Sequence, residues 1–99
     1  MAIKKIYIAG KITGDTNYQA KFHKAKLKMQ GMGYAVLHPA MLPDGFEYED
    51  YMEVCFAMID VCQKAYFLKD WEQSPGAIRE SLYCKAKGYI RIFEELENV

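Results

Sequence analysis

Several features of membrane, metal-binding and nucleic-acid-binding proteins are missing from this sequence of 99 residues. Its longest apolar runs are far shorter than the roughly 20 residues that cross a bilayer, and its start lacks the pattern of a signal peptide, so no membrane association is expected. Thirteen basic side chains balance thirteen acidic ones. This balance gives no broad electrostatic attraction to a nucleic-acid polymer or an anionic membrane surface.

Cysteine and histidine are also scarce. The three cysteines form no C-x-x-C pair, and His23 and His38 stand apart from them, so the sequence predicts no metal site and no cofactor. An odd number of cysteines is typical of reduced thiols, which indicates a cytoplasmic protein. What the chain has in quantity is hydrophobic side chains, 52% of all residues. We therefore expect a single domain over residues 1–99 with one core.

Four short apolar or β-branched runs predict strands, and three stretches of helical spacing lie between them. The strands are expected at residues 3–9, 34–37, 65–68 and 89–93. The helices are expected at residues 18–30, 51–63 and 77–87. This alternation, with right-handed crossovers, predicts an α/β fold: a three-layer sandwich of the flavodoxin or Rossmann type on a four-stranded parallel sheet.

The helix at residues 18–30 is amphipathic. Phe22, Ala25 and Met29 recur on one side, which predicts that this side contacts the sheet. The rest of the helix carries lysines that are expected to face water: Lys21, Lys24, Lys26 and Lys28.

The helix at residues 51–63 is apolar nearly all the way round, which is typical of a helix buried on more than one side. In a domain of four strands the second side is most easily covered by another subunit, so we expect a homodimer or a larger homo-oligomer. Asp60 stands alone in this apolar surround. Three roles are open for it: a catalytic carboxylate, a partner of a lysine, or a polar residue at the helix edge.

Residues 10–17, GKITGDTN, form a loop after the first strand. Gly10 and Gly14 permit positive φ and close approach of a ligand to the backbone. The spacing is not that of G-x-G-x-x-G, and a turn that merely needs glycine explains it equally well. His38, at the end of the second strand, is expected at the same edge of the sheet, where a lone histidine is more often structural than catalytic.

Residues 71–80, WEQSPGAIRE, form a second loop at that edge. Ser74 is a favourable N-cap and Pro75 favours the first helical position, so Glu80 lies about one and a half turns into a helix. The free N–H groups and the positive dipole at this helix end suit an anion. Since open α/β sheets bind ligands at the carboxyl ends of their strands, Glu80 is the candidate functional carboxylate. The simpler alternative is a helix cap followed by an exposed acid beside basic neighbours.

Both loops resemble motifs of the nucleoside 2-deoxyribosyltransferase superfamily, in particular its small uncharacterised bacterial and phage members. The matching stretches are YIAGKITG at residues 7–14 and W-x-x-S-x-G-A-x-x-E at residues 71–80, and the resemblance runs over nearly the whole chain. It implies that Glu80 is the nucleophile that attacks the anomeric carbon of deoxyribose, and that Tyr7 contacts this nucleophile or the sugar. Such chemistry suits a fixed carboxylate, which stabilises and traps an oxocarbenium-like centre.

The resemblance also implies a set of contacts to the substrate, a deoxynucleoside or deoxynucleotide. With His38 from the second strand end, the expected substrate-binding residues are Gly10, Ile12, Thr13, Gly14, His38, Trp71, Ser74, Gly76 and Ala77. In the deoxynucleoside monophosphate N-hydrolase branch, the glycine loop and a serine at the position of Ser74 hold the 5′-phosphate, so a 5′-monophosphate is the expected substrate. Thr13 stands where that branch has an arginine, and Lys11 is the alternative source of positive charge.

The chain departs from the superfamily in several places. Cys55 and its neighbours occupy the region where family enzymes carry an aspartate that protonates the leaving base, and Gln63 or Lys64 stands where many relatives have another aspartate. Only six residues follow Phe93, whereas family enzymes complete their sites with a C-terminal segment of a neighbouring subunit. Three functions are therefore weighed. The leading hypothesis is an N-glycosidase or deoxyribosyltransferase. The alternatives are a non-catalytic nucleotide-binding module and an oligomeric interaction protein with a vestigial cleft.

Overall fold

A computed structural model describes residues 3–96, in which strands and helices alternate. The strands are β1 (Lys4–Ala9), β2 (Tyr34–Leu37), β3 (Lys64–Phe67) and β4 (Ile90–Phe93). The helices are α1 (Tyr18–Gly31), α2 (Tyr48–Cys62) and α3 (Pro75–Lys87). Short 3-10 turns lie at Pro39–Met41, Trp71–Gln73 and Glu94–Leu96.

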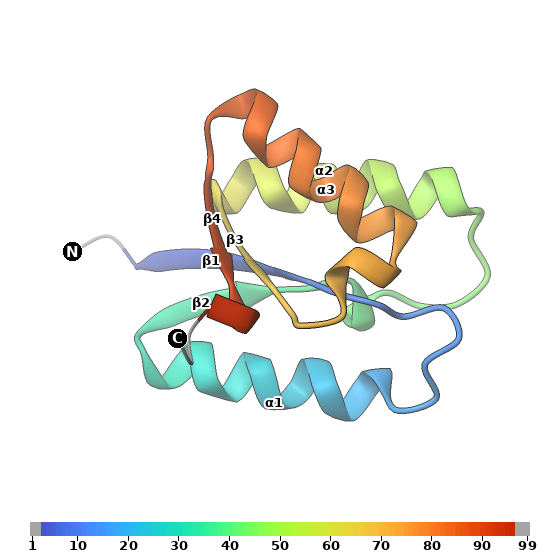
Figure 1. The fold of residues 1–99 in the computed structure, drawn as a ribbon, viewed down its shortest axis with the longest axis horizontal. Coiled ribbons are helices and arrows are strands. Elements are labelled where there is room, and N and C mark those ends of the chain that lie inside the picture. Colours follow the sequence, from blue (N-terminus) through green and yellow to red (C-terminus); the bar gives the residue numbers. More distant parts are fainter. Residues whose placement is uncertain (1–2, 97–99) are drawn as a thin grey trace.

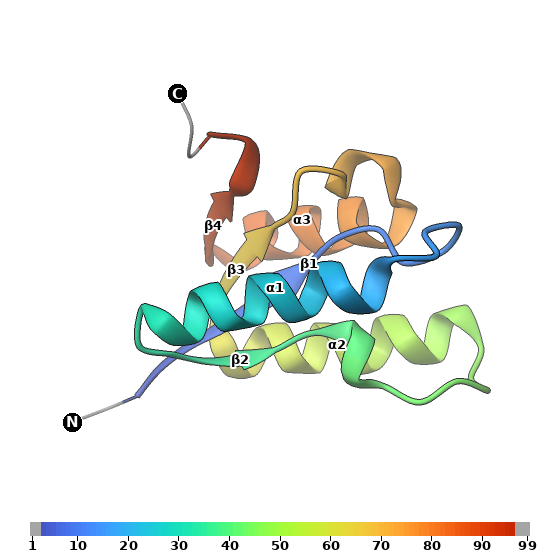
Figure 2. The ribbon, with the colours of Figure 1, turned by 90° about the horizontal axis from the view of Figure 1, so that it is seen from below.

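Every pair of neighbouring strands in the sheet is parallel, and the strand order is β2-β1-β3-β4. Helix α1 covers one face of the sheet, and α2 and α3 cover the other (Figures 1 and 2). The predicted α/β sandwich on a four-stranded parallel sheet is thus confirmed.

Strand β1 divides its side chains between two cores, because successive residues of a strand point to opposite faces. Ile6 and Ile8 pack in the core that contains Phe22 of α1. Tyr7 and Ala9 point the other way, into the core under α2 and α3. The second of these cores therefore lies directly beneath the helix that carries Glu80.

Helix α2 begins at Tyr48, three residues earlier than predicted. The Asp50 carboxylate accepts a hydrogen bond from the backbone N–H of Glu47 at 3.1 Å and thereby caps the helix start. Glu49 and Asp50 also place negative charge in the first turn, where the helix dipole favours it. These acids look like loop residues in the sequence because they precede the apolar stretch.

The apolar circumference of α2 is only partly covered. Its sheet-facing side is buried, and Phe56 stacks on Tyr83 of α3 with ring centroids 4.4 Å apart. Val54 and Val61 keep 44% and 54% of their surface exposed. Helix α3 thus supplies part of the predicted second contact of α2.

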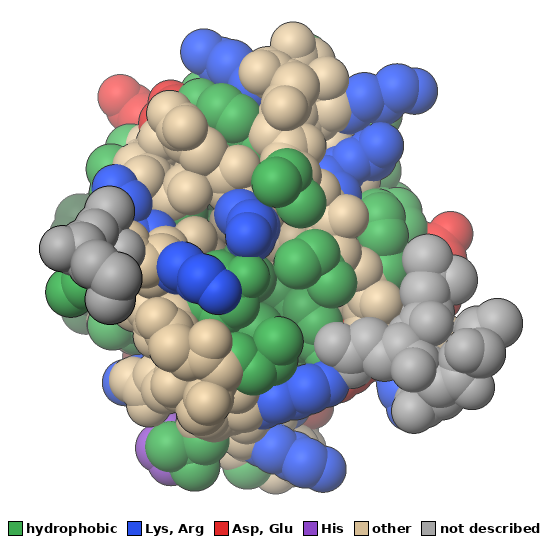
Figure 3. Space-filling view, turned by 90° about the vertical axis from the view of Figure 1, so that its left-hand side faces the viewer, with side chains coloured by type: hydrophobic (Ala, Val, Ile, Leu, Met, Phe, Trp, Pro, Cys, Tyr) green, Lys and Arg blue, Asp and Glu red, His purple; other side chains and the backbone are tan. Residues whose placement is uncertain are grey.

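The amino-terminal end of the sheet is rich in lysine and arginine, which surround a group of hydrophobic side chains in Figure 3. Lys4 and Lys64 lie over the ring of Tyr34, 5.6 and 5.1 Å from its centroid.

Within residues 3–96, no helix is long and apolar enough to cross a membrane.

Candidate functional site

A cavity of about 450 Å³ opens where β1 and β3 end. The chain leaves β1 for β2 at one edge and then crosses back to β3, so these adjacent strands form the point at which the strand order reverses. Crevices at such points are the usual ligand sites of open α/β sheets, and the volume lies in the range of small-molecule pockets. The lining comes from residues 10–13, the segment after β2, residues 73–77, and side chains of α2 and α3.

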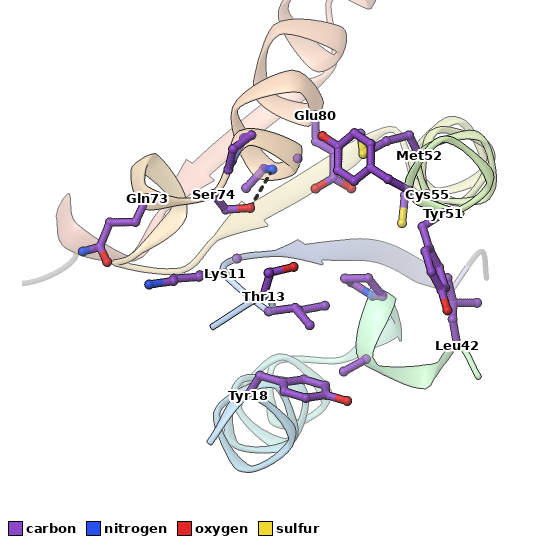
Figure 4. A pocket seen from close by; sticks show the side chains of 18 of the residues that line it. Lys11, Thr13, Tyr18, Leu42, Tyr51, Met52, Cys55, Gln73, Ser74 and Glu80 are labelled. Atoms are coloured by element: carbon purple, nitrogen blue, oxygen red, sulfur yellow. Dashed lines mark hydrogen bonds between the residues drawn. The ribbon is translucent and has the colours of Figure 1, made fainter. Parts of the chain in front are cut away.

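The two ends of the cavity differ in character. Lys11, Gln73 and Ser74 lie at one end (Figure 4). Leu42 and Tyr51 lie at the other, with Tyr18 and Met52 also in the wall. A ligand with a polar or anionic group and a flat apolar group matches this division.

Glu80 is buried in the cavity wall, with 4% of its surface exposed. Ser74 Oγ accepts a hydrogen bond from the Ala77 N–H at 3.1 Å and fixes the first turn of α3. From that turn, helical spacing directs Ala77, Glu80 and Cys84 towards the sheet. Glu80 is therefore not the exposed acid of the simpler alternative.

Tyr7 and Glu80 form a buried hydrogen bond in which the Tyr7 hydroxyl donates to Glu80 Oε2. Burial raises the pKa of Glu80 to about 7, although hydrogen bonds from Tyr7 and Cys55 act in the opposite direction. Burial and the nearby Glu80 charge raise the pKa of Tyr7 well above its usual value, so the phenol remains a donor. Near neutral pH the site holds a carboxyl group that exists in both protonation states.

Cys55 of α2 lines the cavity close to this pair. Burial, assisted by the Glu80 charge, raises the pKa of the Cys55 thiol to about 12. A thiol in that state is neutral and unreactive at physiological pH. Cys55 consequently serves as a weak hydrogen-bond donor to the carboxylate.

The glycine loop contributes Gly10, Ile12 and Thr13 to the lining, as predicted, and Gly14 lies outside it. Gly14 has the expected positive φ, +82°, but Gly10 does not. A Cβ at Gly10 would lie 2.8 Å from Leu68 Cδ1, and Leu68 is buried. The reason for glycine at this position is thus close packing on Leu68 rather than an unusual backbone angle.

Of the other predicted substrate-binding residues, Ser74, Gly76 and Ala77 line the cavity, whereas His38 and Trp71 lie outside its lining. His38 is buried against the Phe22 ring, and its Nδ1 has no hydrogen-bond partner among the described residues. Burial, with smaller effects of nearby positive charge, lowers the pKa of His38 to about 4 and keeps it neutral. Trp71 packs against the rings of Phe67 and Phe93.

Asp60 lies outside the cavity lining and bridges α2 to the following elements. Its two carboxylate oxygens accept hydrogen bonds from Tyr83 at 2.7 Å and Tyr89 at 2.8 Å. These bonds lower the pKa of Asp60. Of the three roles left open for Asp60, that of a lysine partner is not the one its hydrogen bonds show. Its hydrogen-bond partners are Tyr83 and Tyr89, and Lys87 contributes only a smaller electrostatic effect on its pKa.

Sequence patterns did not reveal the apolar end of the cavity. Tyr51 donates a hydrogen bond to the Pro43 carbonyl at 2.7 Å and accepts one from the Phe46 N–H at 3.3 Å. It therefore holds the loop that brings Leu42 and Asp44 to the cavity. The turn Pro43-Asp44-Gly45 was the available signal, because a long loop in a small domain is often functional.

The prediction that Lys21 faces water is wrong. Its side chain is 22% exposed, and its ammonium group bonds to Asp15, Asp70 and the Lys11 carbonyl.

Within residues 3–96, no group of three or more histidine, cysteine or acidic side chains is placed to hold a metal ion.

Comparisons with known proteins give a family and a fold. The sequence profile of a family described as "Domain of unknown function (DUF4406)" matches residues 4–93. None of the curated proteins matches the chain. Among solved structures, a 2-desoxiribosyltransferase from Leishmania mexicana is similar, with a TM-score of 0.73 and 22% sequence identity over 91% of this chain. The match spans 63% of that longer protein, and at this identity it establishes the shared fold alone.

Proposed function

This chain belongs to the DUF4406 family, and we propose that it cleaves the N-glycosidic bond of a deoxynucleotide or deoxynucleoside, with Glu80 as nucleophile. The observation that carries the proposal is the buried Glu80 carboxyl group, held by Tyr7 in a cavity large enough for such a ligand. The fold shared with a 2-desoxiribosyltransferase supports the reaction class.

In the proposed reaction, an oxygen of ionised Glu80 attacks C1′ of the deoxyribose. The bond from C1′ to the base nitrogen breaks, its electron pair stays with the base, and the base takes up a proton. Water or a second base then attacks C1′, the bond from C1′ to the Glu80 oxygen breaks with its electron pair returning to the carboxylate, and the attacking group loses a proton to solvent. The product is the free sugar when water attacks and a new nucleoside or nucleotide when a second base attacks. Tyr7 fixes the carboxylate orientation through this sequence.

Protonation of the leaving base is the weak point of the site. Cys55, in the region where the resemblance calls for an aspartate, has a pKa of about 12 and is a poor acid. General acid catalysis contributes roughly 10²–10⁴-fold to such reactions. We therefore propose slow turnover that favours substrates with good leaving bases.

The polar end of the cavity suits the 5′-phosphate. Ser74 Oγ accepts the Ala77 N–H, so its own O–H proton remains available to donate to a phosphate oxygen. The N-terminus of α3 and the Lys11 side chain supply positive potential at the same end. A 2′-deoxynucleoside 5′-monophosphate is thus the proposed substrate, and the flat base would occupy the end near Tyr51 and Leu42.

The second candidate is a module that binds such a nucleotide without cleaving it. The weakly acidic Cys55 thiol, in the region where the resemblance implies an aspartate, favours this alternative. To separate the two, the protein is incubated with a panel of deoxynucleosides and their 5′-monophosphates, and released base is measured by chromatography alongside an E80Q control. Release by the wild type alone supports the enzyme. Binding without release supports the module, and neither binding nor release contradicts both.

We also propose that the protein forms a homodimer or larger homo-oligomer through α2. The exposed Val54 and Val61 side chains on this helix support a contact with another copy.

A further inference from the structure

We infer that Lys21 is a positioning residue whose ammonium group fixes the loop of residues 11–15 and, through this loop, the polar end of the cavity. Lys21 lies on α1, outside the cavity lining, and would act through Lys11 and its neighbours. The inference rests on the proposed function, because the end of the cavity that it concerns is the one assigned to the 5′-phosphate.

One ammonium group joins three separate parts of the chain. Lys21 Nζ donates to the Lys11 carbonyl oxygen at 2.6 Å, to Asp15 Oδ2 at 2.6 Å and to Asp70 Oδ2. Lysine has three N–H donors, so all of them are used. Lys11 and Asp15 belong to the loop after β1, and Asp70 belongs to the loop after β3.

Asp70 completes a closed ring of contacts. Its Oδ1 accepts the backbone N–H of Lys11 at 3.0 Å, while its Oδ2 binds Lys21. The N–H and the carbonyl of Lys11 are therefore both held, one by Asp70 and the other by Lys21. The peptide groups on both sides of Lys11 are fixed at the place where β1 gives way to the cavity wall.

The loop beyond Lys11 is held by the same group. Asp15 donates its N–H to the Ile12 carbonyl at 3.1 Å, and its Oδ1 accepts the Asn17 N–H at 2.8 Å. Lys21 therefore binds Lys11 at the start and Asp15 at the end of the turn that carries Ile12 and Thr13 into the cavity lining.

The electrostatics make Lys21 difficult to replace. Burial lowers its pKa, but the bonds to Asp15 and Asp70 outweigh burial, so the pKa of Lys21 is raised and the group stays charged. The three side chains are only 22–23% exposed, which reduces screening by water. Without the ammonium group, two carboxylates that share one partner would repel each other, and the Lys11 carbonyl would lose its donor.

The experiment compares K21M with K21R and with K24M, the same change one turn along the exposed side of α1. Amide hydrogen exchange is measured at residues 11–15 in the ligand-free protein. The affinities for 2′-deoxyadenosine and 2′-deoxycytidine 5′-monophosphates are measured in parallel. For K21M we expect exchange about tenfold faster and affinity about tenfold weaker. A tenfold change is the size of effect that one hydrogen bond to a charged group produces. In turnover, KM should rise while kcat stays within about twofold.

K21R should restore most of both properties, because guanidinium keeps the charge and donates to two carboxylates, and K24M should match the wild type. Wild-type exchange rates in K21M would overturn the inference. Faster exchange with unchanged affinity would also overturn it, since the loop would then not position the ligand. If the wild type binds neither nucleotide, the proposed function fails, and the exchange rates still decide whether Lys21 fixes the loop.

Discussion

In the proposed reaction Glu80 has to be ionised to attack C1′, yet its surroundings favour the neutral acid. Burial raises its pKa to about 7, and the hydrogen bond from Tyr7 is the main interaction that favours the charged form. The pKa of Glu80 therefore lies close to neutral pH, where a small change in pH or in one hydrogen bond alters the charge of the carboxyl group.

Replacement of Glu80 by glutamine should remove turnover and keep the fold. The amide has the shape of the protonated carboxyl group and still accepts the Tyr7 hydroxyl, but it cannot form the covalent intermediate. We expect E80Q to release base at least about 10³-fold more slowly than the wild type and to bind the nucleotide nearly as well. Base release by E80Q at the wild-type rate would remove Glu80 from the mechanism.

Glu80 should also make the protein less stable as pH rises. Its folded pKa is about 7 against a reference value of 4.5, so between these values the folded chain holds a proton that the unfolded chain has released. Raising the pH through this window costs up to about 3 kcal/mol of the free energy of unfolding. Urea unfolding at pH 5 and pH 8 should show this loss in the wild type and a smaller loss in E80Q. Equal losses of unfolding free energy in the two proteins would show that the ionisation of Glu80 does not affect stability.

Replacement of Tyr7 by phenylalanine should shift the pH dependence of activity. The variant loses the hydrogen bond that stabilises the Glu80 carboxylate, so the pKa of Glu80 rises further above its wild-type value of about 7. A hydrogen bond to a charged group is worth about 1.5–3 kcal/mol, which corresponds to a shift of about 1–2 pH units. The rising limb of kcat/KM against pH should move upward by that amount. An unmoved limb would show that another group controls it.

At the scale of elements, the start of α3 combines a structural task with a proposed binding task. Ser74 caps the helix through the Ala77 N–H, and its hydroxyl proton is the part available to a ligand. Aspartate is as good an N-cap as serine, so it separates the two tasks.

We predict that the wild type prefers a 5′-monophosphate to the free deoxynucleoside and that S74D reverses this preference. The added carboxylate keeps the cap but repels phosphate oxygens. Isothermal titration with both ligands, beside thermal unfolding, measures the two effects separately. If both proteins bind the two ligands equally and only the unfolding temperature changes, Ser74 is a helix cap and nothing more.

At the scale of the whole molecule, the exposed side of α2 predicts self-association. Val54 and Val61 lie on the part of the helix that α3 leaves uncovered, with 44% and 54% of their surfaces exposed. Light scattering should find a dimer or larger assembly at micromolar concentration, and the double variant V54D/V61D should be a monomer with an intact fold, because buried unpaired carboxylates are costly at an interface. A monomeric wild type would contradict the prediction.

Local patterns in the sequence were sufficient for the architecture. The apolar, β-branched run at residues 3–9 predicted β1, and the Ser74-Pro75 pair marked where α3 begins. Both signals act over a few residues, through the steric periods of strands and helices, so they require no knowledge of distant parts of the chain. Parallel strands in turn placed the loops after β1 and β3 at one edge of the sheet.

The state of the site was decided by tertiary structure. Glu80 and Tyr7 are 73 residues apart, and only the packing of α2 and α3 on one face of the sheet buries them together and raises the pKa of Glu80 to about 7. The amphipathic pattern of α1 predicted that Lys21 faces water. That pattern cannot show that Asp15, before the helix, and Asp70, after β3, place their carboxylates beside the Lys21 ammonium group. Burial and charge pairing depend on which distant segments meet, whereas the sequence by itself determined which segments are helices and strands.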